Sequence, residues 1–378
     1  MKLIKYKLGD LIRQRRQKND SNDLPICGVT RDGFIPPKQQ DADTSLYNVF
    51  YLKDFVFNPA RMELNAIVFN DRYEKAICSS LYEVFYVNRP EVILPEYLAL
   101  LVKQDWFTRY CEFMGSGSAR EYCRVANISE LEIEVPPIEF QAEMTRDNQI
   151  IRERIELKRR INDNLVATVT AIYRRMFIEG GRIYPTAPLK QLCSKIGSGA
   201  TPKGGKTAYQ ESGVSLIRST NIFDYAFSYD DLAHISDEQA DQLSNVVVEG
   251  NDVLFNITGV SVTRCCIVPA DVLPARVNQH VMILRPNTAM PMSYYIMTTL
   301  CSAENKAKLM GIAQSGSTRE AINKQEMESF SIPVPPTKEV QDFEIKARGL
   351  YESVIRNTEE IMRLNVMQQL LLSQLSSR

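Results

Sequence analysis

The sequence predicts an α+β fold in which a globular α/β domain followed by a long helix occurs twice. Two observations predict it: an internal repeat that spans about half of the chain, and a glycine-poor helical segment after each of two Pro-Pro pairs. The chain has 378 residues, of which 44% are hydrophobic and 24% are charged, so it is long enough to form two or three domains with cores of their own.

The repeat is strongest at the end of each globular half. Residues 117–121 (Gly-Ser-Ala-Arg-Glu) recur as 316–320 (Gly-Ser-Thr-Arg-Glu), and 133–137 recur as 332–336, in both cases 199 positions later. Between these ends 8 of 21 positions are identical without a gap, where composition alone would give roughly one or two. Gln141 and Gln341 extend the match. Two copies of one unit form a pseudo-symmetric pair, because a solenoid needs three or more repeats.

Each globular half has short β-like runs followed by a helix. The runs at 48–57, 81–87 and 246–255 lie between Gly, Pro and Asn residues, and the helices are expected over 95–114 and 291–310. A short strand with alternating apolar residues then leads to Pro136-Pro137 or Pro335-Pro336, which ends it because proline lacks the donor for a strand ladder.

After each Pro-Pro pair the sequence predicts a long helix, over about 138–178 and 338–376. The second helix has a heptad seam at Leu350, Val354, Asn357, Ile361, Leu364, Gln368, Leu371 and Leu375. In the first helix, Ile150, Leu157 and Ile161 begin a similar seam that continues to Leu165, Val169, Ile172 and Met176. A 40-residue helix is about 60 Å long, so we expect the two helices to cover each other's apolar seams. The expected organisation is a globular domain over 1–137, a helix over 138–180, a globular domain over 181–337 and a helix over 338–378.

Composition and motifs argue against several classes of protein. No apolar run approaches a membrane span, no secretion signal follows Met1, and eight scattered cysteines without a Cys-x-x-Cys pair fit a reducing cytoplasm. With only two histidines, a metal site and a His-dependent enzyme are both disfavoured. A phosphate loop at 199–207 fails on spacing, since the first glycine would have to stand at Ala200, and Asn58-Pro59 lacks the rest of an amino-methyltransferase motif. We therefore expect no catalytic site, no metal and no cofactor.

The ordered motifs resemble the specificity subunits of type I restriction–modification systems. In the second half the resemblance rests on 195–202, 216–222, 277–281, 316–320 and 332–336 with Gln341, and in the first half on 54–61, 79–82 and 136–137 with Gln141. It implies two target-recognition domains, which are separated by two long antiparallel coiled-coil helices acting as spacers. It also implies a bipartite double-stranded DNA target, two methyltransferase subunits as partners, and restriction (motor) subunits in the full complex. The Gly-x-Thr-Pro entry of the second half is absent from the first, so the two domains are expected to read different half-sites.

Base readout needs Arg, Lys, Asn, Gln and Thr side chains on loops or at strand ends. The candidates in the first half are Thr30, Arg31, Arg61 and Arg120. Those in the second half are Lys203, Lys206, Arg218, Thr220, Asn221, Asn256, Thr258, Asn278, Gln279 and Arg319. A structural role competes with DNA contact at each position, and the basic run from Arg13 to Lys18 is better explained as solvated surface.

Two other functions remain open from the sequence. One is the recognition subunit of a related system whose partner both cuts and methylates DNA, since the difference lies in the partner. The other is a coiled-coil adaptor that does not bind DNA. The net charge of −1 favours the adaptor slightly, because proteins that bind DNA by charge alone are usually basic. Two divergent globular domains on a like scaffold favour recognition.

Overall fold

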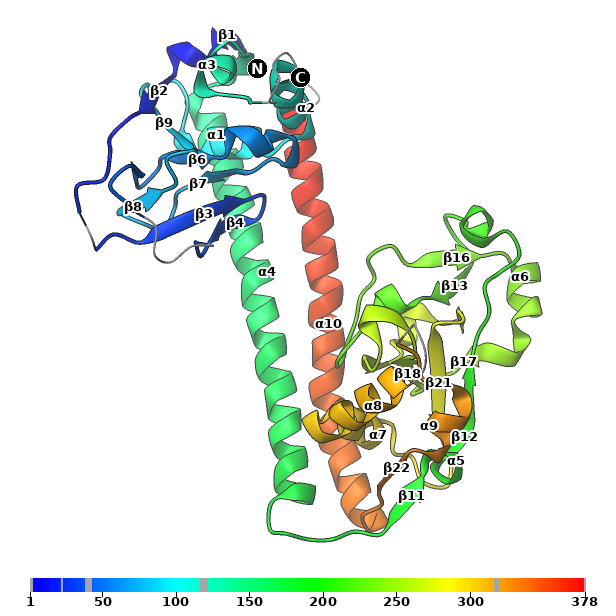
Figure 1. Ribbon diagram of the computed structural model, residues 1–378. Coiled ribbons are helices and arrows are strands. Elements are labelled where there is room, and N and C mark those ends of the chain that lie inside the picture. The colour runs from blue at the N-terminus through cyan, green and yellow to red at the C-terminus, as the bar shows by residue number, and fades with distance from the viewer. Residues whose placement is uncertain (1–2, 22, 38–42, 116–121, 316–319, 377–378) are drawn as a thin grey trace. The chain divides into compact units, whose positions relative to one another are not determined.

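Figure 1 shows the computed structural model, which describes residues 3–21, 23–37, 43–115, 122–315 and 320–376, without the side chains of Lys206 and Ser376. The chain divides into two compact units. The first unit comprises residues 1–153 together with 366–378, and the second unit comprises residues 154–365.

The first unit contains two four-stranded sheets. One has the order β2-β9-β6-β7, with bounds Ile12–Arg15, Glu83–Val87, Phe55–Phe57 and Ile67–Phe69. The other has the order β4-β3-β8-β5, with bounds Gly33–Ile35, Ile26–Thr30, Lys75–Cys78 and Asn48–Tyr51. A ribbon pairs β1 (Ile4–Lys7) with β10 (Glu132–Val135). The short helices are α1 (Pro95–Leu101), α2 (Asp105–Gly115) and α3 (Val125–Ser129).

The second unit repeats this arrangement. Its sheets have the order β12-β21-β18-β19, with bounds Cys193–Ser198, Val281–Pro286, Val253–Asn256 and Cys265–Ile267, and the order β16-β13-β20-β17, with bounds Ala233–Ile235, Val214–Ile217, Ala275–Val277 and Val247–Val248. The ribbon pairs β11 (Thr186–Pro188) with β22 (Ser331–Pro333), and a hairpin joins β14 (Ile222–Phe223) to β15 (Ala226–Phe227). The short helices are α5 (Leu189–Leu192), α6 (Asp237–Gln242), α7 (Ser293–Cys301), α8 (Ala303–Ser315) and α9 (Lys324–Ser329).

The strands of the two four-stranded sheets and of the ribbon therefore correspond one to one in the two units, as the sequence repeat predicts, while the β14–β15 hairpin is described in the second unit alone. In each unit the second sheet contains one parallel pair, β3 with β8 or β13 with β20, among antiparallel neighbours. The α+β fold with two pseudo-repeated globular units and two long helices is confirmed.

Two predicted strands are each divided in the structure. The run 48–57 forms β5 and β6, and the run 246–255 forms β17 and β18, which belong to different sheets. The break falls at Lys53 (φ 69°) in the first unit and at Asn251 (φ 68°) in the second. A left-handed residue turns the chain from one sheet into the other, and a lysine there has no sequence signature.

The predicted helices after β9 and β21 are also divided. The first consists of α1 and α2, and the second of α7 and α8. Ser302 marks the second break, because its hydroxyl accepts a hydrogen bond from the backbone N–H of Asn305 (3.4 Å) as at the start of a new helix.

The two long helices are α4 (Ile138–Tyr173), which continues as a π-helical turn over Arg174–Ile178, and α10 (Thr337–Ser376). They run antiparallel to each other within each unit. In the first unit, Gln368 Nε2 donates to Asn148 Oδ1 (2.9 Å), and in the second Asn357 Nδ2 donates to Asn162 Oδ1 (2.8 Å). No helix in the described part of the chain is both long and apolar enough to span a membrane.

The predicted seam is right for α10 and wrong at the start of α4. Val354, Leu364 and Leu375 are buried, whereas Ile150 and Leu157 are 55% and 51% exposed and Ile161 is also exposed. The inner face of α4 carries polar side chains there instead, which pair with polar groups of α10. Lys158, for example, donates to Asn357 Oδ1 (2.9 Å) and forms an ion pair with Glu360 (2.8 Å). Apolar spacing alone does not reveal a polar seam of this kind.

The main core of each unit is completed by the end of the helix that belongs to the other repeat. In the first unit, Leu371, Leu372 and Leu375 of α10 pack on the core that contains Met144 and the α1 side chains. In the second unit, Val169, Tyr173 and Phe177 pack on the core that contains Phe343 and the α7 side chains. Both globular units thus depend on residues from both long helices.

Both units bury one aspartate at the same position, but the arginine that pairs with it comes from different strands. Arg15 of β2 donates to Asp54 from Nε (2.6 Å) and Nη2 (3.0 Å). In the second unit Arg285 of β21 donates to Asp252 at 2.7 Å and 2.8 Å. The position of Arg15 is occupied by Gly197 in the second unit, so the ion pair is retained although its cation has moved.

The helix that starts each short-helix pair is capped from a long helix. Gln141 Oε1 accepts from the backbone N–H of Leu94 at the start of α1 (2.9 Å), and Glu344 Oε1 accepts from that of Tyr295 near the start of α7 (2.7 Å). The pairing of Gln141 with Gln341 in the repeat is therefore not a shared role, because Gln341 is exposed and Glu344 caps α7. Burial raises the pKa of the Glu344 carboxyl from 4.5 to about 7.

The Arg285 variant tests the buried ion pair. Arg285→Met leaves the Asp252 carboxylate buried without its cation, and we expect the free energy of unfolding of the second unit to fall by about 3–5 kcal/mol. The measurement is the urea midpoint of that unit. The control is Lys346→Met, which removes an exposed ion pair with Asp342 and should change the stability by about 1 kcal/mol or less. Equal losses in the two variants would contradict the assignment.

Glu344 makes the stability of the second unit dependent on pH. Between pH 4.5 and 7 the folded state holds a proton on Glu344 that the unfolded state has released, so stability should fall as pH rises through this window. The expected loss is on the order of 3 kcal/mol. Glu344→Gln should remove this slope from urea midpoints measured at pH 5 and pH 8, and Gln141→Glu should introduce one in the first unit. An unchanged slope in Glu344→Gln would refute the prediction.

Candidate nucleic-acid interface

Three segments of the second unit that carry predicted site residues meet at one place. They are the turn η5 (Ser219–Asn221), the end of β18 with the turn η7 (Gly259–Ser261), and residues 278–280 between β20 and β21. Asn256 Nδ2 donates to the backbone oxygen of Ser219 (2.9 Å), the backbone N–H of Ile257 donates to His280 (3.0 Å), and that of Asn278 donates to Ile217 (3.1 Å). The strand ends of both sheets therefore place these residues together.

A chain of hydrogen bonds links four polar residues of this place, which we call the polar cluster (Thr258, Asn278, Gln279 and His280). Gln279 is exposed, Thr258 and His280 are half-buried, and Asn278 is buried. His280 Nδ1 lies 2.6 Å from Thr258 Oγ1, and His280 Nε2 lies 3.1 Å from Gln279 Nε2. Because the Gln279 nitrogen can only donate, His280 Nε2 accepts and the ring proton lies on Nδ1. Gln279 is thereby held in one orientation, with its carbonyl oxygen and a second amide N–H still available to a ligand. Such a pair of groups matches the N6 and N7 edge of adenine.

Three predicted site residues of the second unit are buried or form hydrogen bonds and ion pairs within the protein. Asn221 is fully buried, and its Oδ1 accepts from the backbone N–H of Arg218 (3.0 Å). The Arg218 guanidinium forms an ion pair with Asp231 (2.8 Å) and lies over the Tyr209 ring. Asn256 is fully buried too, and its Oδ1 has no hydrogen-bond partner among the described residues. These side chains fix the segments that carry the polar cluster.

The remaining predicted residues of the second half are not members of the polar cluster, or they lie outside the described residues. Thr220 is exposed on η5, beside the cluster. Lys203 is exposed, and its backbone oxygen accepts from Gln239 of α6. The side chain of Lys206 and the whole of Arg319 lie outside the described residues.

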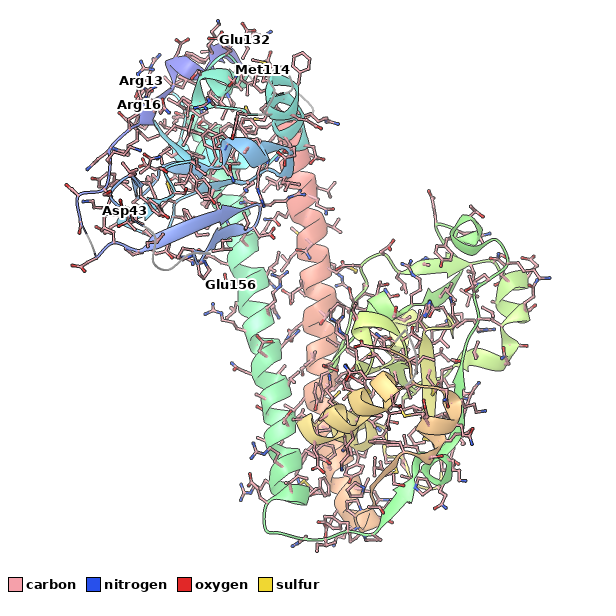
Figure 2. All side chains as sticks on the ribbon, in the orientation of Figure 1. Arg13, Arg16, Asp43, Met114, Glu132 and Glu156 are labelled. Carbon is pink, nitrogen blue, oxygen red and sulfur yellow. The ribbon has the colours of Figure 1, made fainter. Side chains whose placement is uncertain are left out.

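In the first unit the predicted residues lie on two separate turns. Thr30 Oγ1 donates to the backbone oxygen of Gly33 (3.0 Å) in the β3–β4 hairpin, and Arg31 is exposed at its tip. Arg61 is exposed on the turn η2 (Pro59–Leu64), which follows β6 as η7 follows β18. Arg120 lies outside the described residues. Within the basic run from Arg13 to Lys18, Arg15 forms an ion pair with Asp54 inside the unit. Arg13 and Arg16, which are labelled in Figure 2, are exposed.

Two residues of these sites were not among the predicted ones. His280 orients Gln279, and Lys103 Nζ donates to the backbone oxygens of Arg31 (2.7 Å) and Ile67 (2.6 Å), which ties the β3–β4 hairpin to β7. The position of His280 next to Gln279 in the sequence could have suggested the first. No local pattern could have suggested the second, because Lys103 is 72 positions from Arg31.

The residues that follow the Gly-Ser-x-Arg-Glu segments are placed in the same way in both units. The backbone N–H of Cys123 donates to the oxygen of Pro59 (3.0 Å), and that of Ile322 donates to the oxygen of Ile257 (2.9 Å). In the second unit the N–H of Gly259 also donates to the oxygen of Glu320 (3.1 Å). In each repeat the residue two positions after this segment, Cys123 or Ile322, therefore lies next to the residues that follow β6 or β18. Among the described residues, no group of three or more His, Cys, Asp or Glu side chains could hold a metal ion.

Comparison with known proteins finds a family model that matches part of the second half. Residues 186–347 match the type I restriction modification DNA specificity domain. The structure of the S subunit of a type I restriction-modification system from M. genitalium aligns with 99% of this chain and 96% of its own, with a TM-score of 0.65 and 14% sequence identity. At this identity the likeness shows the fold.

Two further solved structures align over nearly the full length at lower TM-scores. One is the HsdS subunit from Thermoanaerobacter tengcongensis, at 18% identity, coverage of 99% of this chain and 96% of that chain, and a TM-score of 0.38. The other comes from work on assembly and conformational transition of the type I R-M system, at 20% identity, coverage of 99% and 97%, and a TM-score of 0.43.

Gln279 provides a direct test of the polar cluster. Gln279→Ala should weaken binding of the chain, within its complex, to its target DNA by about 1–3 kcal/mol, and it should relax the base requirement at one position only. Binding is measured with a panel of oligonucleotides that vary one base pair at a time. The matched control is Gln242→Ala on the exposed end of α6, which should change neither quantity. An unchanged base preference in Gln279→Ala would contradict the assignment.

Proposed function

We propose that the chain is the DNA sequence-specificity subunit of a type I restriction–modification system, because residues 186–347 match the type I restriction modification DNA specificity domain. It reads a bipartite target and positions the subunits that modify and cut DNA.

The observation that carries the proposal beyond the second half is the correspondence of the two units. The first unit has the strand orders of the second in both four-stranded sheets and in the ribbon. A chain with two such domains can bind two separate half-sites. We assign residues 1–137 and 181–337 as the two target-recognition domains and residues 138–180 and 338–378 as the spacers between them.

The proposed contacts with DNA follow from which side chains are exposed and which already form hydrogen bonds or ion pairs within the protein. Gln279, which is exposed, and Thr258, which is half-buried, are proposed to face base edges, with Thr220 beside them. Asn278 is buried and its Oδ1 accepts from the backbone N–H of His280 (3.0 Å), so it is proposed to support these residues. Asn221, Asn256 and Arg218 position these residues from within the unit. Arg31 at a hairpin tip and Arg61 on η2 are the proposed contacts of the first unit, where Thr30 shapes the hairpin. Arg120, Arg319, Lys203 and Lys206 are proposed on sequence position alone.

The chain's charge suggests that its partners contribute to DNA binding. At a net charge of −1 the chain has little overall attraction for phosphates, so most of the salt-dependent affinity would come from other subunits. The twofold repeat offers two like surfaces, which fits two methyltransferase subunits, with restriction subunits joining in the full complex. The chemistry then belongs to these partners, and this chain selects the site without catalysing a reaction. Its place is the cytoplasm, where the DNA is.

A methylation map of the whole genome tests the function. Deletion of the gene should abolish one split, asymmetric methylated motif, and returning the gene should restore it. The partner genes must be expressed in both strains, and this is checked on their transcripts. If the map does not change under these conditions, the chain is not the recognition subunit, and an adaptor without a DNA role becomes the better explanation.

The length of the spacers should set the distance between the half-sites. A heptad inserted into both α4 and α10 keeps their pairing and lengthens each helix by roughly 10 Å, which corresponds to about 3 bp of DNA. The expected result is a methylated motif whose half-sites are unchanged and whose central gap is longer by that amount. A heptad inserted into α4 alone disrupts the polar seam and serves as the control that should abolish methylation. An unchanged gap in the double insertion would rule out this role of the helices.

A further inference from the structure

The loop between β18 and β19 presents an apolar side chain to solvent beside the polar cluster. Val260, on the turn η7, is fully exposed. It follows Thr258 by two residues, and the Thr258 hydroxyl oxygen lies 2.6 Å from His280 Nδ1. Val262, two residues further on, is buried and packs in the main core of the second unit. One valine of this loop therefore anchors it, and the other extends away from the protein.

Backbone hydrogen bonds hold the loop in one conformation. The N–H of Val262 donates to the oxygen of Gly259 (2.9 Å), which closes the turn that carries Val260. The N–H of Gly259 donates in turn to the oxygen of Glu320 (3.1 Å), and the N–H of Thr263 donates to that of Asn256 (2.9 Å). The position of Val260 is therefore fixed from both sides of the turn.

The same loop contains a strained residue. Thr263 has a φ of 73°, and a β-branched residue rarely adopts this left-handed conformation because of its steric cost. Such strain persists only where the surrounding structure imposes it, and it is concentrated at functional sites. Thr263 is buried, so packing of the loop imposes the strain. An exposed Val260 adds little to folding, so the strained loop that presents it indicates a role in binding.

The polar cluster indicates what Val260 contacts. The exposed amide of Gln279 matches the N6 and N7 edge of adenine, and this edge lies in the major groove of DNA. The apolar group that base edges display in the major groove is the C5-methyl group of thymine, and the minor groove displays none. An aliphatic side chain beside an adenine-reading amide is therefore placed to contact a thymine methyl group.

We propose that Val260 contacts the methyl group of one thymine in the half-site that the second unit reads. This inference rests on the proposed function and adds a specificity-determining residue to it. Valine suits the contact, because its branched side chain has little rotamer freedom to lose. Burial of one methyl group against another apolar group strengthens binding by about fourfold.

Replacement of thymine by deoxyuridine tests the contact, because it removes the methyl group and leaves the hydrogen-bonding edge unchanged. The chain, in complex with the subunits that modify DNA, is titrated with target duplexes in which one thymine at a time is replaced. At one position of one half-site we expect binding to weaken by about fourfold. If no thymine shows a loss while the complex still prefers its target, the inference fails and the proposed function stands. A complex without any sequence preference would overturn both.

Two variants assign the methyl contact to a residue. Val260→Ala should bind the unmodified target about as weakly as the wild type binds the sensitive uracil duplex, and uracil at that position should cause no further loss. The matched control is Ile183→Ala, which truncates another exposed aliphatic side chain, in the segment before β11, and should keep the uracil effect. Both variants should keep the wild-type melting temperature, because neither side chain is buried. A uracil effect that persists in Val260→Ala would refute the inference.

Discussion

Completion of each hydrophobic core by a distant helix end is the constraint on which this structure depends. The α10 residues Leu371, Leu372 and Leu375 close the core of the first unit, and the α4 residues Val169 and Tyr173 close that of the second. The first unit therefore cannot bury its apolar surface with contiguous residues, whereas the second unit includes the end of α4 that completes its core. The long helices are structural parts of both units, and their polar seam keeps them in one antiparallel register, since a shift would bury unpaired amides.

The architecture could be predicted because the repeat is visible in the sequence and because Pro-Pro marks the start of each long helix. Finer features depended on contacts between distant residues. Lys53 and Asn251 divide predicted strands through a left-handed conformation, which asparagine favours but lysine does not signal. The seam of α4 was misplaced at Ile150 and Leu157 because Asn148, Lys158 and Asn162 occupy the inner face, where their partners on α10 satisfy them.

The candidate site was predictable by residue type and not by role. Asn221, Asn256 and Gln279 are all amides on loops or at strand ends, yet two are buried as supports and one is exposed. Burial depends on how the two sheets of the unit meet, which the sequence does not reveal. The arginines that pair with the buried aspartates illustrate the same limit. Arg15 and Arg285 pair with equivalent aspartates from strands that are not equivalent, so aligned positions within a repeat do not guarantee the same function.

The discontinuous composition of the first unit has a consequence for its synthesis. The residues of this unit up to 153 leave the ribosome early, but the helix end that closes its core follows after the entire second unit. At usual elongation rates of roughly 5–20 residues per second, the nascent first unit waits on the order of 10–45 s with that apolar face uncovered. The second unit, being contiguous, can fold during this interval. The N-terminal half of the chain is thus the half that most needs a chaperone during translation.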